Sequence, residues 1–119
     1  MYINVPKLPL EGQCRCGAVR IRITAAPVMT SICHCSGCQA MSSSAFSLTA
    51  MVPNEGFEVI EGEPVVGGMH DPSQQHMGCA HCLSWMFTRI EGAPFVNVRP
   101  TMLDDARWFT PFLETMTRE

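Results

Sequence analysis

The chain has 119 residues, of which 46% are hydrophobic and 16% are charged. This length suits one domain, 1–119, and the composition excludes a disordered chain because it supplies enough apolar surface for a core. The net charge is −3 and the basic residues are scattered, which argues against a nucleic-acid clamp. No stretch approaches the roughly 20 apolar residues of a membrane span. We therefore expect a soluble cytoplasmic protein that binds neither nucleic acid nor membrane.

The predicted elements are mostly short strands. Residues 1–10 contain two prolines and are expected to be extended. Apolar residues then alternate with polar ones over residues 19–24, 46–52 and 83–88, which predicts strands with one buried and one wet face. Further β-prone runs at residues 57–60, 65–66 and 95–98 are separated by turn residues at 61–62 and 91–94. These spacings are typical of hairpins.

Helical periodicity is weak by comparison. No stretch of a dozen residues repeats its apolar positions every 3.6 residues, and we expect only short helical turns at residues 39–45 and 104–107. The aromatic residues are expected in the core, namely Phe46, Phe57, Trp85, Phe87 and Phe95. The pattern favours antiparallel sheets with long connections over a sandwich with a large core.

Seven cysteines form three tight groups along the chain. In a compartment that keeps thiols reduced, such groups bind metal or do chemistry more often than they form disulfides. A set of buried free thiols, or a redox pair entering a helix, fits the spacing less well. The groups are Cys14 with Cys16, then Cys33 with Cys35 and Cys38, then Cys79 with Cys82.

The first and last groups supply four thiolates, the ligand set of a tetrahedral structural zinc ion. Each pair precedes an alternating strand, so we expect the two pairs at equivalent positions on adjacent strands. The predicted fold is therefore all-β, with short antiparallel strands in twisted sheets closed by a zinc-ribbon-like pair of cysteine knuckles. Binding of the metal would contribute directly to folding.

The middle group leaves three thiolates within six residues. Three protein ligands hold zinc with a fourth position open to water or a substrate thiol, which distinguishes a catalytic zinc site from a structural one. We therefore predict a second, catalytic zinc ion at Cys33, Cys35 and Cys38. The alternative is that a histidine closes the site and makes it structural; the candidates are His34, His70, His76 and His81.

Four segments carry a family resemblance, at residues 12–20, 33–46, 79–82 and 98–105. The first reads Gly-Gln-Cys-Arg-Cys-Gly-Ala-Val-Arg, and the second contains Cys-His-Cys-Ser-Gly-Cys followed by Ala-Phe. The last two read Cys-Ala-His-Cys and Val-Arg-Pro-Thr-Met-Leu-Asp-Asp. In this order they resemble the glutathione-dependent formaldehyde-activating enzymes and their relatives, including the centromere protein V group.

The resemblance implies an all-β fold, the same division into structural and catalytic zinc, and a carbon–sulfur lyase. The substrates it implies are a thiol such as glutathione and a small aldehyde such as formaldehyde. This chain has Gln39-Ala40 where the family usually has a basic pair, and so it lacks two positive charges that would attract anionic glutathione. The alternative function is a non-catalytic double-zinc module with a structural or protein-interaction role.

Two further pairs of charged residues have alternative interpretations. Asp104 and Asp105 form either an acid/base pair or, more simply, the cap of a turn. Arg20 and Arg22 lie on the predicted wet face of the first alternating strand and are either surface charges or ligands of a substrate carboxylate.

Overall fold

The computed structural model describes residues 7–115 and 117, and the side chains of residues 68–71 are outside that description. Its strands form two sheets, and neither closes on itself within the described residues. The smaller has the order β1-β2-β5, with bounds Leu10–Gln13, Arg20–Ile23 and Phe57–Glu61. The larger has the order β10-β3-β4-β9-β8-β7-β6, with bounds Leu113–Thr115, Met29–Cys33, Ser47–Pro53, Phe95–Val98, Trp85–Ile90, Gln74–Gly78 and Val65–Asp71.

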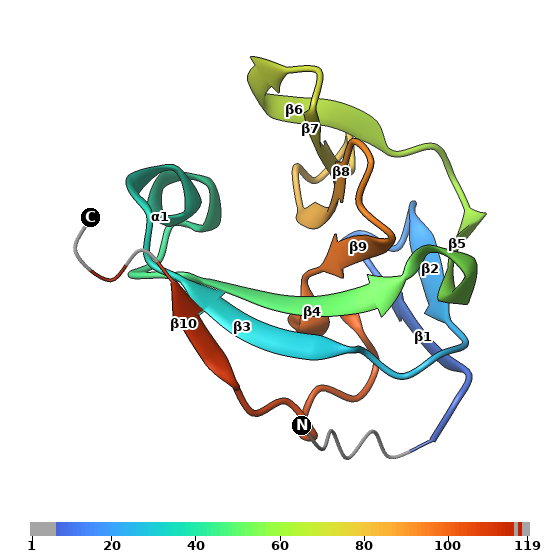
Figure 1. The fold of residues 1–119 in the computed structure, drawn as a ribbon. Helices are drawn as coiled ribbons and strands as arrows, with labels where there is room; N and C mark the ends of the chain where they lie inside the picture. The colour runs from blue at the N-terminus through green and yellow to red at the C-terminus, as the bar shows by residue number, and fades with distance from the viewer. Residues whose placement is uncertain (1–6, 116, 118–119) are drawn as a thin grey trace.

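All neighbouring strands are antiparallel except β10, which pairs with β3 in parallel. The helical segments are α1 (Ser36–Ser42) and two short 3₁₀ turns, Asn54–Gly56 and Pro100–Met102. Figure 1 shows α1 and β10 at one end of the β3–β4 pair and the three-stranded sheet near its other end. No helix among the described residues is long and apolar enough to cross a membrane.

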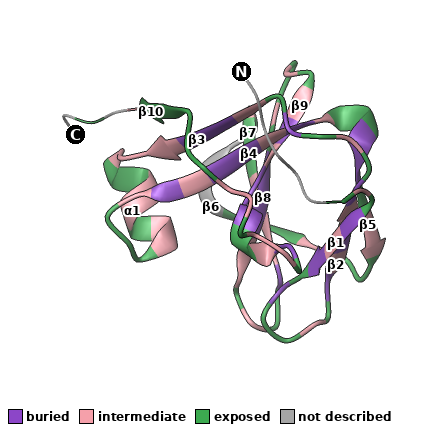
Figure 2. Ribbon diagram, turned by 90° about the horizontal axis from the view of Figure 1, so that it is seen from below, coloured by how far each residue is buried: buried purple, intermediate pink, exposed green. Residues whose placement is uncertain are grey.

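The core lies between the two sheets (Figure 2). Val19, Ile21 and Ile23 are buried, as their alternation predicts. They share one cluster with residues of β4, β5, β8 and β9, namely Val52, Phe57, Met86, Phe87, Val96 and Val98. Of the aromatic residues expected in the core, Phe57 and Phe87 are buried, and their rings lie 4.7 Å apart.

Several expectations from the sequence are wrong in detail. Phe46, Trp85 and Phe95 are only partly buried, because they lie on surfaces other than the one between the sheets. Leu83 is not the start of a strand. It has φ 63 and is 83% exposed, and β8 begins at Trp85.

The helical segments also differ from the expected positions. The helix is at Ser36–Ser42, earlier than 39–45, and a 3₁₀ turn at Pro100–Met102 precedes the region expected at 104–107. Residues 1–6 of the expected extended leader lie outside the described part of the chain, and Leu10 begins β1.

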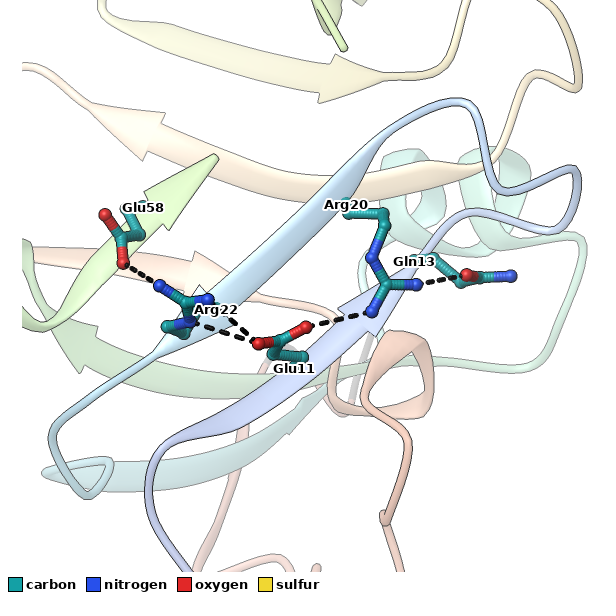
Figure 3. A network of polar contacts seen from close by, with 5 residues as sticks. All are labelled: Glu11, Gln13, Arg20, Arg22 and Glu58. Carbon is teal, nitrogen blue, oxygen red and sulfur yellow. Dashed lines mark hydrogen bonds and ion pairs between the residues drawn. The ribbon is translucent and has the colours of Figure 1, made fainter. Parts of the chain in front are cut away.

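Arg20 and Arg22 are engaged on the outer face of the three-stranded sheet. The Glu11 carboxylate lies 3.0 Å from Arg20 and 2.9 Å from Arg22, and Arg22 also pairs with Glu58 at 3.1 Å (Figure 3). Hydrogen bonds from both arginines hold the pKa of the Glu11 carboxyl below its usual value. These partners favour the surface-charge interpretation of the two arginines over that of a substrate site.

Asp105 forms the cap of a turn. Its Oδ1 accepts hydrogen bonds from the Arg107 backbone N–H at 3.0 Å and from Arg107 Nε at 3.2 Å. Its backbone carbonyl also accepts one from Trp108 Nε1. The adjacent Asp104 is exposed, and the turn-capping interpretation of this pair is therefore confirmed for Asp105.

Candidate metal centres

Four cysteines meet where a turn of each sheet approaches the other. Cys14 and Cys16 lie in the turn between β1 and β2, and Cys79 and Cys82 lie in the turn between β7 and β8. The four sulfur atoms are all within 4.8 Å of one another. The expected grouping is therefore present, but its expected placement on adjacent strands is wrong. The two turns belong to different sheets, and the cluster joins those sheets.

The sulfur separations fit a tetrahedral zinc ion. Cys14 Sγ lies 3.6 Å from Cys16 Sγ, and Cys16 Sγ lies 3.7 Å from Cys79 Sγ. Zinc–sulfur bonds of about 2.3 Å at tetrahedral angles require about 3.8 Å between sulfurs, whereas a disulfide requires about 2.05 Å. The four-cysteine cluster is therefore able to hold zinc as it stands.

Backbone N–H groups point at the sulfur atoms in both turns. Val19 N donates to Cys14 Sγ at 3.4 Å, and Cys82 N donates to Cys79 Sγ at 3.5 Å. Such bonds favour thiolate over thiol. The first turn needs φ +82 at Gly17, a conformation that glycine adopts without strain. The turns are thus shaped around the sulfur atoms.

Ser84 also favours the charged form of a cysteine in this cluster. Its hydroxyl lies 3.1 Å from Cys82 Sγ, and this contact, with a backbone hydrogen bond involving Cys16, lowers the pKa of Cys82 to about 5. Thiolate is the form that binds metal.

The second cluster is built at the junction of β3, α1 and β4. Cys33 ends β3, Cys35 is the N-cap of α1, and Cys38 lies in the first turn of the helix. Their sulfur atoms are all within 4.8 Å of one another. Cys35 Sγ accepts a hydrogen bond from Cys38 N at 3.2 Å, so a thiol takes the place of the usual oxygen cap. This cap explains why the helix begins earlier than expected.

Side-chain hydrogen bonds to backbone carbonyls also stabilise this loop. Gln39 Nε2 donates to the His34 carbonyl at 2.9 Å, and the Ser42 hydroxyl donates to the Cys38 carbonyl at 2.7 Å. Gln39, which stands where the resemblance implies a basic residue, therefore has a structural role in this chain.

The thiols of the second cluster differ in their ease of ionisation. Burial of Cys33 opposes its ionisation, but hydrogen bonds involving Thr115 and the Cys35 backbone outweigh burial, and the pKa of Cys33 lies below its usual value. Burial raises the pKa of Cys38 to about 12, although the nearby Ser47 hydroxyl opposes this rise. A cation among the three sulfurs would favour thiolate at all of them.

No described histidine belongs to either cluster. The His34 Nε2 lies 3.2 Å from Glu114 Oε2, and the His76 Nδ1 lies 2.9 Å from the Thr88 hydroxyl. His81 is exposed, and the His70 side chain is outside the description. For these three histidines the alternative of a closed Cys₃His site is not supported.

Two cysteines of the second cluster line a cavity of about 200 Å³. Cys33 and Cys38 lie on its wall together with Trp85 and Arg99. Arg99 was not identified from the sequence as a site residue. The signal was present, since Asn97 and Arg99 alternate with the buried Val96 and Val98, but a polar residue at such a position normally faces water.

Comparison with known proteins agrees with this arrangement. Residues 9–119 match the sequence model of the family described as "Glutathione-dependent formaldehyde-activating enzyme". The fold is similar to a structural-genomics crystal structure of a Rhodobacter sphaeroides protein, with a TM-score of 0.70 at 20% identity over 88% of this chain and 99% of that one. At this identity the match to the crystal structure supports the fold alone.

Proposed function

Since the chain belongs to the glutathione-dependent formaldehyde-activating enzyme family, we propose that it is a zinc-dependent carbon–sulfur lyase. It would join glutathione or another thiol to formaldehyde or another small aldehyde, and it would cleave the adduct in the reverse direction. In the forward direction the sulfur–carbon bond forms as the carbonyl π bond breaks, and the thiol proton passes to the carbonyl oxygen.

One observation carries this proposal: the Cys33, Cys35 and Cys38 sulfurs converge within 4.8 Å, and two of these cysteines line a cavity. This differs from the four-cysteine cluster, where Cys14 and Cys79 are buried and the ligand set is complete. A three-sulfur set beside a cavity suits a site that exchanges a ligand. A complete set suits a structural ion.

The residues of this chain have separate roles in the proposed reaction. Cys33, Cys35 and Cys38 would hold zinc, and zinc when bound would favour the thiolate form of a substrate thiol. Three protein thiolates offset the charge of a divalent cation, which favours a soft, exchangeable fourth ligand such as sulfur. The cavity would limit the size of the aldehyde that reaches the sulfur atom of the substrate thiol.

A matched pair of variants tests the division of roles. Cys35→Ser removes a ligand from the three-cysteine cluster, and Cys79→Ser removes one from the cluster that joins the sheets. We expect Cys35→Ser to remain folded, to contain about one zinc ion per chain instead of two, and to lose adduct formation by at least about 100-fold. We expect Cys79→Ser to unfold or lose its cooperative transition.

Metal analysis, circular dichroism and a nuclear magnetic resonance assay of thiol–formaldehyde exchange give the three readouts. Equal unfolding of both variants would contradict separate roles. A wild-type protein with two zinc ions and no adduct exchange would instead support the alternative function, a non-catalytic double-zinc module. The cytoplasmic location expected from the sequence is part of the proposal, because glutathione and reduced cysteines coexist there.

A further inference from the structure

The face of the seven-stranded sheet that turns away from the core is polar and buried. The register of the strands places Cys33 opposite Ser47, Ser31 opposite Thr49, and Thr88 opposite Asn97. Directly opposite residues project to the same side of a sheet. Alternation predicts that Ser47 and Thr49 face water, yet they are only 2% and 5% exposed.

This buried polar face coincides with the cavity beside the three-cysteine cluster. Among the described residues, six polar or charged residues are buried. Five of them line this cavity, namely Ser31, Ser47, Thr49, Thr88 and Arg99. Such a concentration of buried polar side chains needs an explanation, because each buried polar group that lacks a hydrogen bond destabilises the folded protein.

Two buried side-chain atoms on the cavity wall, Asn97 Oδ1 and Arg99 Nε, have no hydrogen-bond partner within the described part of the chain. A third, Ser47 Oγ, has no partner other than its contact with the Cys38 thiol. Each such group costs about 1–3 kcal/mol if it stays unpaired. Their convergence on one cavity indicates a place for a polar ligand.

Arg99 supplies the charge at this place. Its side chain forms no ion pair with a carboxylate of the described residues, and Arg99 is 8% exposed. The guanidinium carbon lies 4.2 Å from the centroid of the Trp85 ring, and the backbone N–H bonds the Met86 carbonyl at 2.9 Å. The cation is therefore held in position by stacking on Trp85 and not by a carboxylate of the described residues.

The guanidinium remains charged at neutral pH. Burial lowers the pKa of Arg99 to about 10, and the charges of Cys38 and Cys33 oppose this shift. Three thiolates around a divalent cation leave one negative formal charge, which repels a second anion. The positive charge of Arg99, close to the three-cysteine cluster, would offset this repulsion and allow an anionic ligand to bind.

We propose that Arg99, assisted by Ser47 and Asn97, binds the carboxylate of a small ligand in this cavity, so that the preferred thiol or aldehyde substrate carries a carboxylate close to its reacting group. This inference rests on the proposed function for the identity of the reacting group, but the carboxylate subsite is defined by the cavity itself. The Asn97 amide can offer its NH₂ after a 180° rotation, and the Ser47 hydroxyl can donate.

The cavity size limits the ligand. Sites for drug-sized molecules span about 300–1,000 Å³, and this cavity measures about 200 Å³. It accommodates a carboxylate and a few carbon atoms, and the rest of a longer ligand would lie outside it, towards an adjoining cavity of about 420 Å³ that Ser47, Trp85 and Arg99 also line. The subsite therefore selects thiols or aldehydes that carry a carboxylate within a few atoms of the reacting group.

Propionate and its neutral isostere propionamide test the subsite without any reaction. We expect propionate, added to the zinc-loaded protein, to shift the Arg99 Nε–H resonance saturably, and propionamide to bind at least about tenfold more weakly. Arg99→Gln should weaken propionate binding at least about tenfold, observed through Trp85 fluorescence in a Trp108→Phe background. Ser47→Ala should weaken it by a few fold.

Arg107→Gln is the matched control, because it removes a surface guanidinium that pairs with Asp105, and it should leave binding unchanged. Equal binding of propionate and propionamide, or unchanged binding in Arg99→Gln, would overturn the proposal and leave Arg99 as a counter-ion of the cysteine cluster. If Arg99→Gln fails to fold, the wild-type resonance shift and Ser47→Ala still decide. Propionate binding without lyase activity would reject the proposed reaction and retain the subsite. Lyase activity without propionate binding would reject the subsite and retain the proposed reaction.

Discussion

At the scale of single residues, the cysteine turns depend on neighbours that leave room for them. Gly78 precedes Cys79, and a Cβ atom built on it would lie 2.5 Å from the Ser84 backbone oxygen. Cys79 N donates to that same oxygen at 3.1 Å. The glycine therefore allows the turn between β7 and β8 to close around its two cysteines.

Gly78→Ala should distort this turn. Because backbone atoms, not a flexible side chain, meet the new methyl group, we expect a loss of about 1–3 kcal/mol in unfolding free energy and faster zinc release to a chelator. Gly67→Ala is the control, since nothing lies within 4 Å of a Cβ atom at that position and its stability should change by less than about 0.5 kcal/mol. Equal zinc-release rates in the two variants would show that Gly78 does not shape the cluster.

The cysteine partition was predictable from the sequence because spacing alone limits which thiols can meet. Arg99 was not, because the sequence shows only that it alternates with Val98. Whether the face opposite a buried residue meets water or a closed cavity depends on strands far away in the chain, such as β3 and β8. That information is absent from the local pattern.

At the scale of elements, ion pairs connect the strands of the three-stranded sheet. Glu11 of β1 binds both arginines of β2, and Arg22 continues to Glu58 of β5 (Figure 3). A carboxylate shared between two guanidinium groups loses less side-chain entropy per contact than an isolated pair, so this network contributes more than a single surface ion pair.

Glu11→Gln should lower the melting temperature by a few degrees in low salt, and the difference should shrink at 1 M salt, where the Debye length is about 3 Å. Salt is a cleaner probe than acid, because acid also protonates the cysteines. Glu55→Gln, at an exposed position in the 3₁₀ turn, is the control. A melting difference that does not depend on salt would indicate packing, not charge, as the role of Glu11.

Strands with regular alternation were predictable, and strands with mixed faces were not. Residues 19–24 show the alternation that β2 follows, and the β-prone run at residues 95–98 corresponds to β9. β3 was not predicted, because its consecutive residues Thr30 and Ser31 are both polar and both buried, and its sequence therefore lacks an alternation of apolar and polar residues. β7 begins Gln-Gln-His and has no apolar face to detect. β10 is three residues long and is defined by its pairing with β3.

At the scale of the whole molecule, the four-cysteine cluster acts as a cross-link. It joins turns that are 63 residues apart between Cys16 and Cys79, and each turn belongs to a different sheet. A covalent link closing a loop of this length would stabilise the fold by about 4 kcal/mol on entropic grounds. A bound ion would add its own affinity to that effect.

Removal of zinc should therefore loosen the two sheets from each other before it disrupts pairing within the larger sheet. We expect amide hydrogens of β1, β2 and β5 to lose protection from exchange by at least about 100-fold after chelation. Those of β3 and β4, which pair over five residues, should lose less. The Cys35→Ser variant is the control, because it lacks the exchangeable ion but keeps the link between sheets, and its three-stranded sheet should stay protected. A uniform loss of protection in the chelated protein would mean that the sheets unfold as one unit. Unchanged protection would mean that the apolar core holds them together without the ion.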